Sequence, residues 1–173
     1  MRLIYNNIYI VGFMGTGKTS VARALSDKCG YNFIDLDEAI VNIADMTIPE
    51  IFSKLGESEF RKLEKTVLLD VSAKKHMAVS CGGGIMLSAE NIAVMKSSGI
   101  MIRLNASATT LYKRLDGCRN RPLLMSGASP QENINRLIAE REIYYSKADY
   151  TIITDDLSID EVACEVIKII NGK

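Results

Sequence analysis

The 173-residue chain lacks an excess of charge of either sign and any apolar run long enough to cross a membrane. Its 21 lysine and arginine residues are balanced by 21 aspartate and glutamate residues, which argues against a surface for a polyanion such as nucleic acid. The first residues lead almost at once into a strand-like run, not into a signal peptide. We therefore expect a cytoplasmic protein with neither a nucleic-acid nor a membrane partner.

Cysteines are few, and their spacing excludes some kinds of site. Cys29, Cys81, Cys118 and Cys164 are scattered, so the sequence predicts neither a disulfide framework nor a cysteine-based metal site. With 47% hydrophobic residues, a chain of this length can bury one substantial core. We therefore expect a single domain over residues 1–173, and a monomer is the simplest expectation for so small and neutral a chain.

The most specific motif present is GFMGTGKT, residues 12–19, which follows an apolar, strand-like run. The spacing of Gly12, Gly17, Lys18 and Thr19 matches the loop whose backbone N–H groups surround a polyphosphate. Lys18 would reach the β- and γ-phosphates, and the Thr19 hydroxyl would bind Mg²⁺. A glycine turn that binds nothing is the alternative, but a chance match is expected in only about one chain of this length in two hundred. The expected nucleotide-binding residues of this loop are Gly15, Thr16, Gly17, Lys18, Thr19 and Ser20.

Strand-like and helical segments alternate along the chain. Short runs rich in apolar or β-branched residues predict strands at residues 8–13, 32–37, 77–81, 100–105 and 150–154. Pairs typical of capping boxes mark three helix starts: Thr47 with Glu50, Ser129 with Glu132, and Ser158 with Glu161. Such alternation predicts an α/β protein in which a five-stranded parallel sheet is covered on both faces, in a three-layer α/β/α arrangement.

One long stretch, residues 117–129, has no periodic pattern. It contains two glycines, a proline and the polar cluster Arg119, Asn120 and Arg121. Loops of this length in compact domains are usually functional lids. We therefore expect a lid over approximately residues 117–129.

Two further groups of residues follow predicted strands, where ligands of parallel sheets bind. Asp35 and Asp37 follow the second strand, and helix capping or a solvated surface explains such a pair about as well as ligand binding does. Gly82, Gly83 and Gly84 follow the third strand. They could form a flexible turn. Three consecutive glycines destabilise a folded segment, however, unless their backbone conformation or lack of side chains is needed, so close approach of the backbone to a ligand is favoured.

In their order and spacing these motifs resemble the shikimate kinase family. The resemblance rests on the phosphate loop, the Asp35-x-Asp37 pair, FRKLE with Arg61 and Glu64, CGGG at residues 81–84, RPLL at Arg121 and AERE at Arg141. It runs from about Tyr9 to the C-terminal helix. It implies a P-loop NTPase fold like that of nucleoside-monophosphate kinases, with a closing lid. It also implies transfer of a phosphoryl group from MgATP to the 3-hydroxyl of shikimate, which gives shikimate 3-phosphate and ADP on the way to chorismate and the aromatic amino acids.

The resemblance also implies a substrate site, placed approximately within residues 35–64 and the glycine turn. Asp37 would bind the substrate hydroxyls, either as a general base or by positioning the reacting hydroxyl. Gly82, Gly83 and Gly84 would also bind the substrate, and the middle glycine, Gly83, would donate its backbone N–H to it. Arg61 and Arg141 would hold the carboxylate, since a guanidinium can bind a carboxylate through two hydrogen bonds. Each arginine could instead be an ordinary helix-surface residue, and Arg61 could then pair with Glu57 or Glu64.

The remaining implied roles concern the nucleotide. Asp35, with Thr19, would lie near the metal. Arg121 of the lid would stabilise the charge of the transferring phosphoryl group, so that the implied catalytic residues are Lys18, Asp37 and Arg121. Arg114 matches the family position that stacks on adenine, although it could be an exposed helical arginine. The tyrosines Tyr144 and Tyr145 are expected to pack, not to contact substrate.

Two other classes of protein have to be weighed. A gluconate kinase or a nucleoside-monophosphate kinase would share the fold and the phosphate loop. Arg61, Arg141 and the glycine turn, however, suit a small carboxylated ring better than a nucleotide. A GTP-dependent switch would need an Asn-Lys-x-Asp string to read guanine, and the sequence has none.

Overall fold

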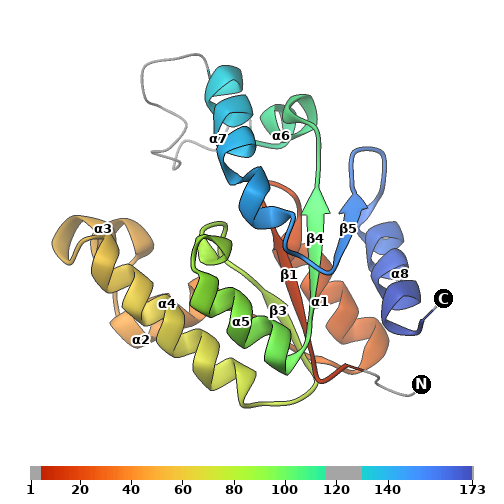
Figure 1. Ribbon diagram of the computed structural model, residues 1–173, viewed down its shortest axis with the longest axis horizontal. Coiled ribbons are helices and arrows are strands. Elements are labelled where there is room, and N and C mark those ends of the chain that lie inside the picture. Colours follow the sequence, from red (N-terminus) through yellow and green to blue (C-terminus); the bar gives the residue numbers. More distant parts are fainter. Residues whose placement is uncertain (1–4, 116–129, 173) are drawn as a thin grey trace.

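The computed structural model describes residues 5–115 and 130–172. Within them, five parallel strands form one sheet in the order β2-β3-β1-β4-β5 (Figure 1). The strands are β1 (Asn7–Gly12), β2 (Asn32–Asp35), β3 (Met77–Ser80), β4 (Ile100–Asn105) and β5 (Tyr150–Ile153). Helices cover both faces of the sheet, so the predicted three-layer α/β/α fold is confirmed.

Side chains that alternate along β1 divide the core into two layers. Ile8 and Ile10 pack with the helices of one face, and Tyr9 and Val11 pack with those of the other. The first face is covered by α1 (Lys18–Cys29) and α8 (Ile159–Ile170). The second face is covered by α2 (Leu36–Ala44), α3 (Ile48–Lys54), α4 (Glu57–Ser72), the short 3₁₀ helix η1 (Ile85–Leu87), α5 (Ala89–Ser98), α6 (Ala108–Leu115) and α7 (Pro130–Tyr145). No helix within the described residues is both long and apolar enough to span a bilayer.

Local signals in the sequence predicted two helix starts correctly. Thr47 forms a capping box with Glu50 at the start of α3, and Ser158 forms one with Glu161 at the start of α8. The Thr47 N–H and hydroxyl donate to the Glu50 carboxylate and lower its pKa to about 2. The third predicted box, at Ser129, and the expected lid at residues 117–129 lie outside the described residues.

The second strand ends earlier than predicted. The pattern predicts a strand over residues 32–37, whereas β2 stops at Asp35 and α2 begins at Leu36. The Asp35 carboxylate accepts hydrogen bonds from the N–H groups of Asp37 (3.0 Å) and Glu38 (3.4 Å), so Asp35 caps α2 and the strand cannot continue. Asp37 therefore lies in the first turn of a helix. The other four predicted strands agree with the structure to within one residue at each end.

The carboxyl ends of β1, β2 and β3 lie together at one edge of the sheet. Ser80, the last residue of β3, is in register with Asp35 of β2 on one side and with Ile10 of β1 on the other. The phosphate loop, the acidic pair and the glycine turn (residues 82–84) each follow one of these strands. The topology therefore brings the three predicted ligand-binding segments to the same edge.

Candidate active site

The phosphate loop has a backbone that only glycine tolerates at its first position. Gly12 has φ of 142°, and a Cβ there would collide with the backbone carbonyl of Leu104 on the neighbouring strand. At the other end, Gly17 has φ of 90° and directly precedes Lys18, the first residue of α1. No side chain caps this helix start. The positive end of the helix dipole at this start favours an anion, as the motif predicts.

The carbonyl of Phe13 holds two side chains of the loop in place. It accepts hydrogen bonds from the Thr16 hydroxyl (2.8 Å) and from the Lys18 ammonium (3.0 Å). Thr16 is only 2% exposed, so its side chain supports the loop from within. Lys18 folds back along the loop, where its charge faces the space that a phosphate would occupy.

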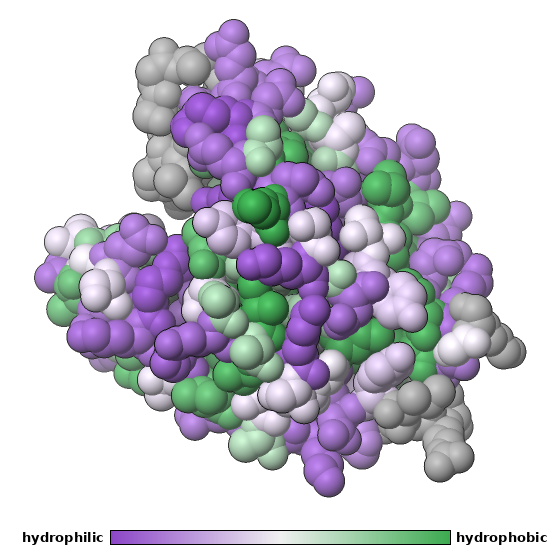
Figure 2. Space-filling model, in the orientation of Figure 1, coloured by the Kyte–Doolittle hydropathy of each residue, from purple (hydrophilic) through white to green (hydrophobic). Residues whose placement is uncertain are grey.

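A cavity of about 260 Å³ lies beside this loop. It brings together predicted residues from three segments, namely Gly15, Gly17, Lys18, Thr19, Ser20, Asp35, Asp37 and Gly83. Met14, Ser80 and Cys81 also line it, although the sequence did not single them out. In the orientation of Figure 1, Figure 2 shows the surface hollowed between the part formed by α2 to α4 and the part that carries α7.

Three oxygen-bearing side chains meet at the base of the cavity. The Thr19 hydroxyl donates to Oδ2 of Asp35 at 2.8 Å and lies 3.1 Å from the hydroxyl of Ser80. Asp35 and Ser80 are both buried. Because the other carboxylate oxygen of Asp35 caps α2, this side chain is fixed at both ends. The capping alternative for Asp35 and its place in the cavity therefore both hold.

At both outer positions of the glycine turn, another side chain lies too close for a Cβ. A Cβ at Gly82 would lie 2.6 Å from Oδ1 of Asp37, and a Cβ at Gly84 would lie 2.6 Å from both terminal nitrogens of Arg61. Gly83 lies between Arg141 and the phosphate loop, whose Met14 nitrogen is 4.0 Å from its Cβ position. The turn is thus a close junction of functional groups and not a loose linker.

Arg61 is held by two glutamates of its own helix, α4. Its Nη1 donates to both carboxylate oxygens of Glu64, at 3.0 and 3.1 Å, and its Nε and Nη2 donate to Glu57. Glu64 is buried, whereas Glu57 is exposed. Burial raises the pKa of Glu64, and Arg61 opposes this effect. The surface pairing that was the alternative for Arg61 is therefore present, but one of its partners is a buried carboxylate next to Asp37 and Gly82.

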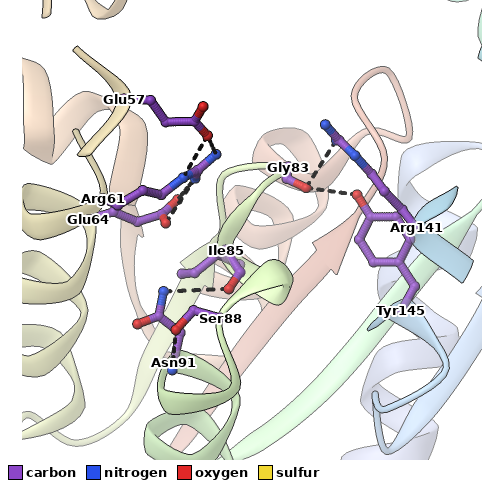
Figure 3. A network of polar contacts seen from close by, with 9 residues as sticks. All are labelled: Glu57, Arg61, Glu64, Gly83, Ile85, Ser88, Asn91, Arg141 and Tyr145. Atoms are coloured by element: carbon purple, nitrogen blue, oxygen red, sulfur yellow. Dashed lines mark hydrogen bonds and ion pairs between the residues drawn. The ribbon is translucent and has the colours of Figure 1, made fainter. Parts of the chain in front are cut away.

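Arg141 reaches the same turn from α7. Its Nη1 lies 3.4 Å from the carbonyl oxygen of Gly83, and its guanidinium stands over the ring of Phe13, 5.7 Å from the centroid. Figure 3 shows Arg61 and Arg141 approaching the turn from opposite sides, one from α4 and the other from α7. The two arginines that the sequence singled out, 80 positions apart in the chain, thus flank one short stretch of backbone.

The remaining predicted residues are placed elsewhere. Arg114 lies near the end of α6, and its guanidinium donates to the hydroxyl (3.2 Å) and the carbonyl (2.7 Å) of Thr154, just after β5. It does not line the cavity described above. Arg121 and Arg119 lie outside the described residues, so their roles stay predictions.

Comparison with known proteins places these features in a family. A family model described as shikimate kinase matches residues 14–171. A shikimate kinase of Thermodesulfovibrio yellowstonii is 42% identical over 171 residues, which cover 96% of this chain and 98% of the relative. Among solved structures, a shikimate kinase from Acinetobacter baumannii in complex with shikimate superimposes with a TM-score of 0.91 at 34% identity, covering 98% of this chain and 95% of that one.

The fold is shared more widely than the sequence. A gluconokinase from Sinorhizobium meliloti superimposes with a TM-score of 0.58 over 99% of this chain and 94% of its own, but at only 14% identity. That likeness concerns the fold alone. The neighbours confirm a P-loop fold like that of nucleoside-monophosphate kinases.

The buried Arg61–Glu64 pair predicts a pH-dependent loss of stability in Arg61→Met. The variant leaves the Glu64 carboxylate buried without its cation, so its pKa rises further above the ordinary value. We expect the free energy of unfolding at pH 7 to fall by about 3 kcal/mol, the lower end for a broken buried pair, because Arg61 is itself 31% exposed. The pKa of Glu64 is higher in the folded state than in the unfolded state. The loss of stability is therefore complete above the folded-state pKa and shrinks as the pH falls toward the unfolded-state pKa and Glu64 becomes protonated.

Urea unfolding at about pH 8, 7 and 5 measures this dependence. Lys62→Met is the matched control, because it breaks only an exposed pair with Glu59 on the same helix and should leave the free energy of unfolding near the wild-type value. The double variant Arg61→Met/Glu64→Gln should recover most of the loss. An equal loss at every pH, with no recovery in the double variant, would contradict the account of Glu64.

Proposed function

Since the chain belongs to the shikimate kinase family, we propose that its cavity and glycine turn together form the site where ATP phosphorylates the 3-hydroxyl of shikimate. The activity is ATP-dependent formation of shikimate 3-phosphate, in the pathway to chorismate and the aromatic amino acids. The observation that carries the proposal for the site is the position of Arg61 and Arg141, on either side of the turn and next to the phosphate loop. A site for a carboxylate thus adjoins a site for a polyphosphate.

The phosphate loop and the start of α1 form the ATP side of the proposed site. The N–H groups of the loop, with those of the uncapped helix start, bind the phosphates. Lys18 leaves the Phe13 carbonyl for the β- and γ-phosphates and stabilises the charge that develops in transfer. Arg114 contacts adenine, and Arg121 approaches the transferring phosphoryl group. Both of these assignments rest on the family resemblance.

The oxygen cluster at the base of the cavity fits Mg²⁺. The hydroxyl of Thr19 and the carboxylate of Asp35 are hard oxygen ligands within 2.8 Å of each other, and Mg²⁺ takes such ligands together with water and substrate phosphates. No cluster of three or more acidic, histidine or cysteine side chains that could hold a metal occurs among the described residues, which suits an ion that arrives with its nucleotide. When bound, the ion neutralises phosphate charge; Thr19 and Asp35 would hold it.

Arg61 and Arg141 hold the substrate carboxylate in the proposed site. Glu57 is 65% exposed, so the substrate carboxylate can replace it on Arg61 at little cost in free energy. Glu64 is buried and keeps the guanidinium oriented during that exchange. The N–H of Gly83 lies at the turn between the two arginines, where it can donate to the substrate.

Asp37 is the proposed partner of the reacting hydroxyl. Its carboxylate lies against the backbone of Gly82 and lines the same cavity as Lys18 and Thr19. A carboxylate in this position accepts the proton of the 3-hydroxyl, or orients that hydroxyl toward the γ-phosphate.

We also propose that the enzyme is a monomer and acts in the cytoplasm, where ATP is available. A single copy of the chain contains every site residue described here.

The substrate assignment is tested by measuring ADP release with shikimate, gluconate and nucleoside monophosphates side by side. We expect release that depends on shikimate and shows saturation, with at most background release for the other acceptors. A nucleoside monophosphate has no carboxylate for Arg61 and Arg141, and gluconate carries its carboxylate on an open, flexible chain, not on a ring that holds a hydroxyl at a fixed distance from it. Product analysis by mass spectrometry should show shikimate carrying one phosphoryl group. Preferential phosphorylation of gluconate or of a nucleotide would contradict the assignment.

Mutations should separate carboxylate binding from chemistry. Arg141→Ala removes a charge-assisted hydrogen bond, so we expect KM for shikimate to rise by about ten- to a thousandfold with a smaller change in kcat. Asp37→Asn keeps the shape of the side chain but removes its charge, so kcat should fall about a hundredfold if Asp37 is a general base and less if it only positions the hydroxyl. Steady-state kinetics with saturating ATP measures both constants.

Matched controls lie on the same helices. Arg136→Ala removes an exposed arginine of α7 that pairs with Glu140, and Glu38→Gln neutralises the exposed neighbour of Asp37. Both should have wild-type kinetics. An analogue in which the carboxylate is a neutral amide should bind weakly to the wild type and be almost insensitive to Arg141→Ala. Equal phosphorylation of the amide and of shikimate would refute the proposal that Arg61 and Arg141 hold the substrate carboxylate.

A further inference from the structure

The carbonyl of Gly83 accepts hydrogen bonds from two side chains of α7. The Tyr145 hydroxyl donates to it at 2.8 Å, and Nη1 of Arg141 lies at 3.4 Å (Figure 3). Tyr145 is 2% exposed, and burial raises the pKa of its hydroxyl against the opposing effect of Arg141, so the group remains a donor at neutral pH. The shorter and better bond of the two is therefore that of the tyrosine.

This hydrogen bond fixes the direction of the next N–H in the turn. In a planar trans peptide the carbonyl and the following N–H point in opposite directions, so a Gly83 carbonyl held toward α7 directs the Gly84 N–H away from α7. Within the described part of the chain, the N–H groups of Gly83 and Gly84 donate to no other residue. They are thus available to a ligand for as long as the turn keeps this orientation.

The same bond also affects Arg141. A partly buried carbonyl without a donor is unfavourable, so removal of the Tyr145 hydroxyl would draw the nearby Nη1 of Arg141 onto Gly83. An arginine N–H engaged in this way is lost to a substrate carboxylate. Tyr145 and the substrate therefore act on the same guanidinium, one by keeping it available and the other by binding it.

Tyr145 is itself held by an ion pair between a buried arginine and an exposed glutamate. Arg103 of β4 is 5% exposed, and its two terminal nitrogens each donate at 2.7 Å to one carboxylate oxygen of Glu142 on α7. The Arg103 guanidinium lies 5.4 Å from the centroid of the Tyr145 ring. This pair ties the last turns of α7 to the sheet, so the tyrosine hydroxyl has a fixed place above the glycine turn.

We propose that Tyr145 is a positioning residue for substrate binding, which holds the glycine turn through the Gly83 carbonyl and keeps Arg141 available for the substrate carboxylate. The inference rests on the proposed function of Arg141. Its signature is an effect on KM for shikimate that depends mainly on Arg141.

The test is Tyr145→Phe, which removes the hydroxyl and keeps the ring. We expect KM for shikimate to rise about five- to tenfold, the equivalent of one hydrogen bond, with kcat within about twofold and KM for ATP unchanged. In an Arg141→Ala background the same substitution should raise KM by a clearly smaller factor, because the arginine is gone and only the effect through the glycine turn remains. With the amide analogue, Tyr145→Phe should likewise raise KM by a smaller factor than it does with shikimate.

Tyr144→Phe is the matched control. Tyr144 is the preceding residue of α7, it is partly buried, and its ring contacts Lys147; its hydroxyl has no hydrogen bond to another described residue. This variant should have wild-type kinetics. An unchanged KM in Tyr145→Phe, a loss of kcat alone, or a KM effect of equal size in the Arg141→Ala background would overturn the inference and leave the proposed function standing. Absence of shikimate turnover by the wild type would instead contradict the proposed function, and the inference with it.

Circular dichroism and thermal unfolding establish whether Tyr145→Phe folds. If it does not fold, Glu142→Gln carries the test, because it weakens the pair that holds the same turn of α7 and its side chain is 53% exposed. We expect a smaller rise in KM for shikimate, and this rise should again be reduced in the Arg141→Ala background. A wild-type KM in Glu142→Gln would then overturn the inference.

Discussion

The arrangement of the site depends on the absence of side chains in the turn after β3. Asp37 and Arg61 lie within 2.6 Å of the positions where Cβ atoms of residues 82 and 84 would lie, and Arg141 and Tyr145 donate to the carbonyl between them. Side chains of three helices from distant parts of the sequence, α2, α4 and α7, therefore meet at one stretch of backbone. Figure 3 shows those of α4 and α7. A side chain at residue 82 would move the acid and one at residue 84 would move Arg61, so close packing and the placement of charge are the same constraint at these two positions.

Burial gives the two central arginine pairs different tasks. Glu64 is buried beside the turn and orients Arg61, which is partly exposed. The Arg61 nitrogens that donate to the exposed Glu57 can therefore donate to a ligand instead. In the pair of Arg103 and Glu142 the arginine is the buried partner, and both of its terminal nitrogens are used. The first pair therefore suits binding, whereas the second fastens α7 to the sheet. Together they give the glycine turn rigid neighbours on both sides.

The sequence predicted those features that depend on local patterns: the alternating strands and helices, the capping boxes at Thr47 and Ser158, and the phosphate loop. It predicted the wrong end for the second strand, because the hydrogen bonds by which Asp35 starts α2 compete with the apolar pattern that favours a longer strand. It gave no signal for Ser80 beside Thr19, or for Tyr145, whose partner lies 62 residues away. Such pairs depend on how the sheet is ordered, which a local pattern does not contain. The phosphate-loop residues came from the motif itself, whereas the two arginines and the roles in substrate binding came from a family resemblance, and these roles stay predictions.

Alanine substitution of the two outer glycines tests most directly whether this turn positions the acid and the arginine. Neither Gly82 nor Gly84 has a positive φ, and each new methyl group would meet only the end of a flexible side chain, so both variants should fold. Steady-state kinetics should show a lowered kcat for Gly82→Ala, whose methyl displaces the Asp37 carboxylate, and a raised KM for shikimate in Gly84→Ala, whose methyl displaces Arg61. KM for ATP should stay near the wild-type value in both. Wild-type kinetics in two folded variants would contradict the account.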